Sequence, residues 1–197
     1  MLHRHVILEG KPTTGKTEVS QLLRIYFPRQ VVILPELTTV LVRENHLDIL
    51  RDRARLTELL LRAVPARAAE VRSILADRPG SMILEESHMG VHLAYARVLG
   101  DQGFLQAWPS IEPHVLTPDL FLRLDIPTDL SVDRQIARGT KDVEVGGTIV
   151  AAASAEVDRW HASRPGDRVA VLSTDRSPEV VLRDLLDILG LVYHPWA

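Results

Sequence analysis

A glycine-rich stretch near the N-terminus has the composition and spacing needed to bind phosphate. Residues 10–17 read Gly-Lys-Pro-Thr-Thr-Gly-Lys-Thr, a complete Walker A pattern. Glycines let the backbone curl until successive N–H groups point inward, and the start of a following helix adds the positive end of its dipole. In this pattern Lys16 reaches the β- and γ-phosphates, and the Thr17 hydroxyl binds Mg²⁺. We therefore expect ATP and Mg²⁺ to be bound by Gly10, Lys11, Pro12, Thr13, Thr14, Gly15, Lys16, Thr17 and Glu18.

Three acidic residues follow strand-like segments and are candidates for the acceptor side of a phosphate transfer. Glu36 comes directly after the apolar run 31–35 and is expected to take the proton from a substrate hydroxyl; a solvated acid at a helix start is the alternative. Glu85 and Glu86 end the next run, where an acid positions Mg²⁺ directly or through water. Because side chains alternate along a strand, only one of the pair faces the loop. We assign the Mg²⁺ side to Glu85 and the substrate side to Glu86, and the reverse assignment stays open.

Two arginines four residues apart, Arg134 and Arg138, share one face of a predicted helix over 128–138. The helix leads into a Gly-Thr-Lys turn. We expect both arginines to be catalytic by neutralising charge on the transferring phosphoryl group, with a lid over about 138–148 that excludes water. A helix with a solvated basic face is the alternative.

The segments that must position these residues alternate between short apolar runs and longer helical patterns. Strands are predicted at 5–9, 31–35, 81–85, 119–125 and 168–173. Helices are predicted at about 15–27, 38–50, 54–77, 89–98, 101–112, 128–138, 148–163 and 178–189, the last with Ser177 as cap, Pro178 in its first turn and Gly190 at its end. This alternation predicts an α/β fold with a parallel sheet covered on both faces.

The composition narrows the class of protein. The chain has 197 residues, which fits a single domain over 1–197 with a short tail at 191–197. The net charge of −3 gives no general attraction for nucleic acid, so any anion must be held by a local site. There are no cysteines, and no apolar stretch approaches the length of a membrane span. We expect a cytoplasmic protein that acts on a small molecule, with neither nucleic acid nor membrane as partner.

Taken together, the motifs resemble the thymidylate kinase and deoxynucleoside kinase group of P-loop kinases. The resemblance rests on "LEGKPTTGKT", "PARAAEV", "ILEES" followed by "LAYARVLG", "TPDLFLRLDIPTDLSVDRQIARG" and "VAVLSTDRSPEVVLRDLL". It implies a five-stranded parallel sheet in the order 2-3-1-4-5, flanked by helices, with a lid after the fourth strand. It also implies Glu36 as the base, Arg67 as a contact to the acceptor, and Arg134, Arg138 and Lys141 as lid residues. Relatives commonly pair through helices, so the resemblance allows a homodimer.

The chain departs from the family pattern after the third strand. Thymidylate kinases have an acid followed by arginine there, and deoxynucleoside kinases have Glu-Arg-Ser, whereas this chain has Glu85-Glu86-Ser87. An acid in place of that arginine opposes an acceptor phosphate by like-charge repulsion. The acceptor is then an uncharged or cationic molecule, or a nucleotide held by other arginines such as Arg43, Arg51 or Arg67.

The sequence therefore predicts an ATP- and Mg²⁺-dependent kinase of a nucleoside, a nucleotide or a nucleoside-like small molecule. One alternative keeps the chemistry but has an antibiotic or a sugar hydroxyl as acceptor. The other is a P-loop ATPase or nucleotide switch that has no small-molecule acceptor.

Overall fold

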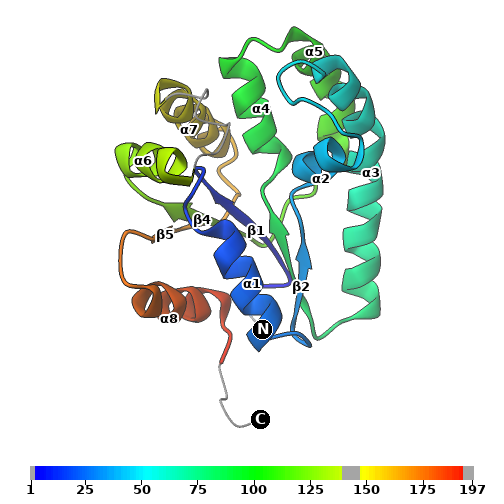
Figure 1. Cartoon of the computed structure of the whole chain (residues 1–197). Helices are drawn as coiled ribbons and strands as arrows, with labels where there is room; N and C mark the ends of the chain where they lie inside the picture. Colours follow the sequence, from blue (N-terminus) through cyan, green and yellow to red (C-terminus); the bar gives the residue numbers. More distant parts are fainter. Residues whose placement is uncertain (1–2, 139–146, 193–197) are drawn as a thin grey trace.

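Figure 1 shows a central sheet with helices on both faces, in a computed structural model that describes residues 3–138 and 147–192. The sheet has five strands in the order β2-β3-β1-β4-β5, and all neighbours pair in parallel. The strands are β1 (His5–Gly10), β2 (Val31–Leu34), β3 (Met82–Glu86), β4 (Leu120–Asp125) and β5 (Val169–Ser173). The expected α/β class and the strand order 2-3-1-4-5 are confirmed.

The helices lie between the strands, where the alternating pattern predicts them. They are α1 (Lys16–Tyr26), α2 (Leu37–Glu44), α3 (Arg53–Asp77), α4 (Met89–Val98), α5 (Gln102–Ile111), α6 (Thr128–Arg138), α7 (Gly147–Ala162) and α8 (Pro178–Leu189), with a 3₁₀ turn η1 (Glu112–His114). Helices α1 and α8 cover one face of the sheet, and α3, α4, α5 and α7 pack against the other. Within residues 3–138 and 147–192, no helix is long and apolar enough to cross a membrane.

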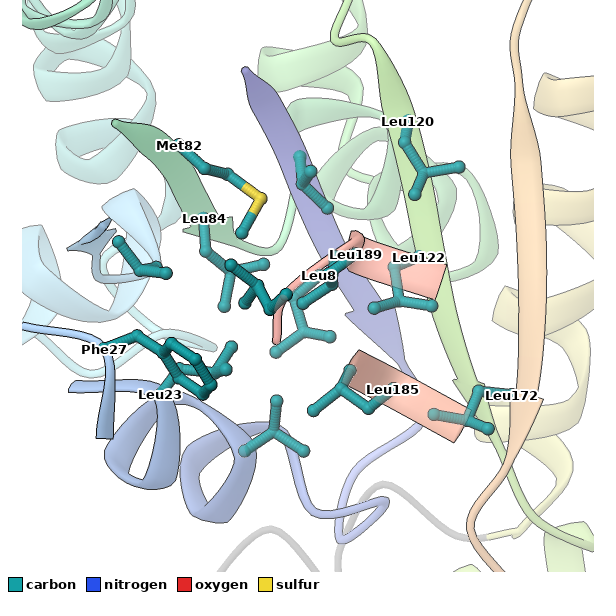
Figure 2. Packing of buried hydrophobic residues seen from close by; sticks show 14 of the residues in the cluster. Leu8, Leu23, Phe27, Met82, Leu84, Leu120, Leu122, Leu172, Leu185 and Leu189 are labelled. Carbon is teal, nitrogen blue, oxygen red and sulfur yellow. The ribbon is translucent and has the colours of Figure 1, made fainter. Parts of the chain in front are cut away.

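Alternation along β1 sends its side chains into two separate cores. Val6 and Leu8 join the core under α1 and α8, where Leu23 and Leu185 meet them (Figure 2). Ile7 joins the core on the opposite face of the sheet. Both faces of β1 are therefore apolar, which explains the continuous run "VIL" in place of a polar-apolar alternation.

Helix α2 is shorter than predicted. The sequence pattern predicts one helix over 38–50, but α2 ends at Glu44. The Asn45 Nδ2 atom donates to the Leu41 carbonyl at 2.9 Å, and His46 has a φ of 52°. A residue in the left-handed region cannot continue an α-helix, so the chain turns away at this point.

The two ends of α8 compare differently with their prediction. Pro178 occupies the first turn, and Gly190 ends the helix with a φ of 65°, both as predicted. Ser177 is the N-cap residue, as predicted, but its side chain makes no capping hydrogen bond. The Ser177 carbonyl instead accepts from the Val181 N–H at 3.1 Å, as the first bond of the helix ladder.

The carboxyl ends of the parallel strands meet at one edge of the sheet. Strand β1 runs into loop 10–17, Glu36 follows β2, Glu86 ends β3, and Asp125 ends β4. In open parallel sheets this edge is where ligands bind. The fold therefore brings together residues that are widely separated along the chain.

Candidate active site

Loop 10–17 passes through backbone conformations that suit glycine. Gly10 has a φ of 151°, and Gly15, the N-cap of α1, has a φ of 97°. A Cβ atom on Gly10 would lie 2.5 Å from the Leu124 carbonyl oxygen, so no larger residue fits there. The first N–H groups of α1 open directly onto this loop. The loop thus has both the curled backbone and the helix terminus that a phosphate site requires.

Lys16 begins α1, and its ammonium group folds back onto the loop. The Nζ atom donates to the carbonyl oxygens of Gly10 at 2.8 Å and of Lys11 at 3.0 Å. Burial lowers the pKa of Lys16, and the nearby carboxylates of Glu36 and Glu86 act in the opposite direction. A half-buried ammonium group beside two acids therefore lies where the sequence predicted the phosphate lysine.

The tip of the loop is fixed to the start of α6. The Ser131 hydroxyl donates to the Pro12 carbonyl at 2.8 Å, and the Thr13 hydroxyl donates to the Ser131 carbonyl at 3.0 Å. The Lys11 ammonium contacts Asp125 Oδ1 at 2.6 Å. These contacts hold the loop backbone from outside the loop, so its shape depends on the junction between β4 and α6.

Glu36 lies where β2 gives way to α2. It is the N-cap residue of α2, and its Oε2 atom accepts from the Thr39 hydroxyl at 2.8 Å. Its charge is the strongest of the carboxylate influences on Lys16. A carboxylate at this position can accept a proton from a hydroxyl placed next to the loop lysine.

Glu85 and Glu86 have different surroundings, as strand alternation predicts. Glu85 Oε1 accepts from Arg67 at 3.0 Å, and Glu85 Oε2 lies 3.1 Å from His5 Nε2. Burial opposes the ionisation of Glu85, but the hydrogen bond from His5 and the charge of Arg67 outweigh it and lower its pKa. Glu86 is in register with Leu8, whose side chain lies in the core under α1, and its charge acts on the loop lysine. The acid that faces the loop is therefore Glu86.

Two cavities open on opposite sides of the loop. The first, named here the α8 cavity, has a volume of ≈ 480 Å³ and is lined by loop residues with Glu18, Arg134 and Arg176. The second, the α4 cavity, has a volume of ≈ 250 Å³. Its polar lining comprises Glu36, Thr38, Thr39, Arg53, His92, Tyr95, Asp101 and Gln135. Because Thr13 lines one cavity and Pro12 the other, the loop separates them.

His92 is a half-buried polar group in the wall of the α4 cavity. Its Nδ1 atom lies 3.4 Å from the Thr38 hydroxyl, and its ring packs edge-on against Phe104 with centroids 4.5 Å apart. Burial lowers the pKa of His92 to about 4. The imidazole is therefore neutral at neutral pH and adds no positive charge to the cavity.

The remaining arginines predicted for the site differ in position. Arg134 lines the α8 cavity and donates to the Thr13 carbonyl at 3.4 Å. Arg67 lines, with Glu36 and Glu86, a narrow pocket of ≈ 40 Å³. Arg43 is exposed on α2 and is not among the residues that line the α4 or α8 cavity.

Part of the predicted site cannot be placed. Arg138 ends α6, but its side chain lies outside the described residues, and so do Lys141 and most of the predicted lid. Their roles, like that of Arg43, stay predictions.

Three residues that hold the loop were not found from the sequence, namely Asp125, Ser131 and Thr174. The Thr174 hydroxyl donates to the Thr14 carbonyl at 2.9 Å from the end of β5. Asp125 carries a usable signal, because it is an acid at the end of a buried strand, as Glu86 is. A single serine or threonine carries no such signal, since these residues are common in helices and turns.

Comparison with solved structures gives the fold a name. The chain matches a structure of deoxyadenosine kinase from M. mycoides with bound dATP at a TM-score of 0.71 and 10% identity, over 95% of this chain and 100% of that chain. The deoxynucleoside kinase fold is present. The same kinase with its products dCMP and a flexible dCDP matches at 0.70 and 12% identity, over 94% and 98% of the two chains. With bound dCTP it matches at 0.66 and 10% identity, again over 94% and 98%.

At the level of sequence alone there is no comparable likeness. Scans against protein-family models and against curated proteins found no match. The deoxynucleoside kinase fold is thus reached here with only 10–12% identity to the matched structures. In this chain the edge of the parallel sheet brings loop 10–17, Glu36 and Glu86 together.

Proposed function

We propose that this protein is a kinase that uses MgATP to phosphorylate a hydroxyl group of a nucleoside or nucleoside-like small molecule. The observation that carries the proposal is the position of Glu36. Its negative charge is close enough to Lys16 to raise the pKa of the lysine, and its side chain also lines the separate α4 cavity. A phosphate loop alone suits many nucleotide-binding proteins, whereas a carboxylate between that loop and a second cavity suits transfer to an acceptor. The structural likeness to deoxyadenosine kinases supports the same class of activity.

The α8 cavity is the proposed site for the nucleoside part of ATP. It adjoins Thr13 and Gly15, so the phosphates can run from it along the loop to Lys16. Arg134 and Arg176 line it and supply planar guanidinium groups for contact with a base or a phosphate. Its volume of ≈ 480 Å³ lies within the range of ordinary ligand sites.

The oxygen donors beside the loop fit Mg²⁺. Thr17 is exposed in the first turn of α1, and Glu86 is the acid on the Lys16 side. Among the described residues there is no cluster of three or more potential protein ligands, which suits an ion held mainly by phosphates and water. When bound, Mg²⁺ neutralises charge on the phosphates. The sequence assigned this role to Glu85, but both of its oxygens engage Arg67 and His5, so we transfer the role to Glu86.

Charge around Glu36 favours an uncharged acceptor over a nucleoside monophosphate. Glu36 and Glu86 line the narrow pocket together, and Arg67, the only arginine among the described residues that line it, is already paired with Glu85 and Glu70. In the α4 cavity His92 is neutral. A phosphate group in the narrow pocket would meet acids without a free counter-charge among the described lining residues, and in the α4 cavity the acids Glu36 and Asp101 face a single lining cation, Arg53.

Transfer then proceeds by displacement at the γ-phosphorus atom. A hydroxyl oxygen of the acceptor in the α4 cavity attacks this atom, and the bond to the bridging oxygen of ADP breaks. The hydroxyl proton passes to Glu36, while Lys16 and the loop N–H groups stabilise the charge on the phosphate oxygens. The chain contributes mainly position and charge, as expected for phosphoryl transfer.

The test is a product survey by mass spectrometry. Purified protein is incubated with MgATP and separate panels of nucleosides, nucleoside monophosphates, sugars and hydroxylated antibiotics, and a Lys16→Ala preparation run in parallel reports contaminating kinases. We expect monophosphorylated nucleosides and ADP in equal amounts. Products from the sugar or antibiotic panel alone would move the proposal to a non-nucleoside kinase. ATP hydrolysis that no panel stimulates would leave an ATPase or switch, and exclusive use of monophosphates would overturn the uncharged acceptor.

A further inference from the structure

A group of acidic and basic side chains, most of them largely buried, lies behind the phosphate loop and is not used by the proposed reaction. It consists of Glu9, His161, Arg164 and Asp167 and is named here the Glu9 cluster. Within the described residues, Glu9 Oε1 has no hydrogen-bond partner, and the contacts among His161 Nδ1, Arg164 Nε and Asp167 Oδ2 do not have hydrogen-bond geometry. Buried polar groups in native proteins are normally satisfied, so a cluster of exceptions calls for an explanation.

The direction of Glu9 follows from the strand. Ile7 points to the face covered by α4 and α7, and Glu9, two residues later, points the same way. There Glu9 Oε2 meets His161 Nε2, from the last turn of α7, at 2.8 Å. A carboxylate only accepts, so His161 donates this bond. Glu9 is 2% exposed, so its carboxylate depends on a protein partner, and His161 supplies one.

The cluster continues away from the loop. His161 Nδ1 lies 3.7 Å from Asp167 Oδ2, and Arg164 Nε lies 3.3 Å from the same oxygen. The Arg164 guanidinium is stacked over the ring of Trp160 at 4.7 Å, and the His161 ring packs edge-on against that ring at 4.9 Å. These contacts fix the orientation of the imidazole ring, so that its Nε2 atom stays directed at Glu9.

Glu9 places the negative charge of the cluster next to the phosphate-binding loop. Glu9 directly precedes Gly10, the first residue of the loop, and its negative charge acts on Lys16. A buried carboxylate is costly unless it is paired, and an unpaired one beside a phosphate site repels the ligand.

We propose that His161 is a positioning residue for the phosphate-binding loop: by bonding Glu9, it holds the end of β1 against α7 and offsets a negative charge that opposes triphosphate binding at Lys16. This role rests on the proposed function only in taking a nucleoside triphosphate as the ligand. His161 acts through Glu9 and touches neither the phosphates nor the acceptor.

The test measures the affinity for MgATP and for magnesium tripolyphosphate by calorimetry in wild type and variants. His161→Leu is expected to weaken both ligands about tenfold, because it leaves the Glu9 charge unpaired. Glu9→Leu/His161→Leu is expected to recover most of the loss, because replacing both partners removes the orphaned charge. Leu189→Ala, a cavity-forming change in the core under α8, is the control for a general loss of stability.

The outcomes separate this role from the proposed function. Wild-type protein that binds neither ligand would overturn both. Wild-type binding with His161→Leu within about twofold, a double variant as weak as the single one, or an equal loss in Leu189→Ala would overturn the positioning role alone. If His161→Leu does not fold, His161→Gln and Glu9→Gln/His161→Gln give the same comparison, again with recovery expected in the double variant.

Discussion

The α8 cavity and the α4 cavity share one loop, but their walls come from different kinds of structure. On its loop side the α8 cavity is lined by consecutive residues, Thr13 to Gly15, whose backbone N–H groups are the proposed phosphate ligands. The polar groups of the α4 cavity are side chains from α2, α3, α4 and α6, such as Thr38, Arg53 and His92. A backbone site depends on the shape of the loop, whereas a site made of side chains changes its ligand preference when those side chains change. Affinity for phosphate and choice of acceptor are therefore expected to respond to different substitutions.

Lys16→Ala is expected to have the largest effect, because Lys16 supplies the proposed positive charge at the phosphates. We expect phosphoryl transfer to fall about 10³-fold or more, since a preorganised charge at the phosphates is lost. The far-ultraviolet circular dichroism should stay unchanged. Product formation is followed by mass, and a variant that keeps a tenth of wild-type turnover would contradict the assignment.

Glu36→Gln tests the group shared by the loop and the α4 cavity. We expect kcat to fall about 10²- to 10⁴-fold, because the amide cannot take the proton, while KM for both substrates changes little. Glu44→Gln, on the exposed end of the same helix α2, is the matched control and should keep wild-type turnover. A large rise in KM with unchanged kcat would assign Glu36 to binding alone.

Two arginines, one in each cavity, test whether the cavities bind different substrates. Arg53 lines the α4 cavity and Arg176 lines the α8 cavity. Arg53→Met should raise KM for the acceptor about tenfold and leave KM for ATP unchanged, and Arg176→Met should do the reverse. Steady-state kinetics with each substrate varied in turn provides the measurement. Equal effects of one variant on both constants would show that the cavities are not separate sites.

The neutral state of His92 predicts a pH dependence of folding on the α4 side. Its pKa is lowered from 6.5 to about 4 by burial, so below pH 6.5 the unfolded chain takes up a proton that the folded chain does not. The contribution of neutral His92 to the free energy of unfolding is complete above pH 6.5. It is lost as the pH falls toward 4, by up to about 3 kcal/mol. His92→Gln should remove this slope. Urea unfolding of both proteins at pH 7 and 5 measures it, and equal slopes would contradict a neutral buried imidazole.

The smallest expected contrast concerns the helix starts beside the two cavities. The Asp101 side chain accepts from the Phe104 N–H at 3.1 Å at the start of α5, whereas Ser177 makes no such bond at the start of α8. Asp101→Ala should therefore lower the free energy of unfolding by about 1 kcal/mol. Ser177→Ala should change it by no more than about 0.5 kcal/mol. Thermal unfolding resolves the difference, and equal losses would mean that Ser177 caps after all.

The same contrast explains how much could be predicted from the sequence. Buried parallel strands leave continuous apolar runs, so the strands and most helices were predicted close to their observed bounds. The loop was predictable because its function resides in contiguous residues and glycines. The predicted C-terminal end of α2 was wrong, because nothing in the sequence around His46 indicates that this residue adopts the left-handed conformation that stops the helix.

The parts that could not be predicted depend on side-chain direction across the sheet. The choice between Glu85 and Glu86 depends on the register between β1 and β3, which sets the face on which each acid lies. The bond between Ser131 and Pro12 joins residues 119 positions apart, and the pair of Glu9 and His161 joins residues 152 positions apart. Nothing local to either member marks such a pairing.

The tether between Pro12 and Ser131 has a consequence for protein engineering. Grafting residues 10–17 alone onto another framework would transfer the Walker A sequence without the Ser131 hydrogen bond that holds the loop backbone in place. A successful graft would have to include Asp125 and the first turn of α6 as well, because their contacts with Lys11 and Thr13 hold the loop in its binding conformation.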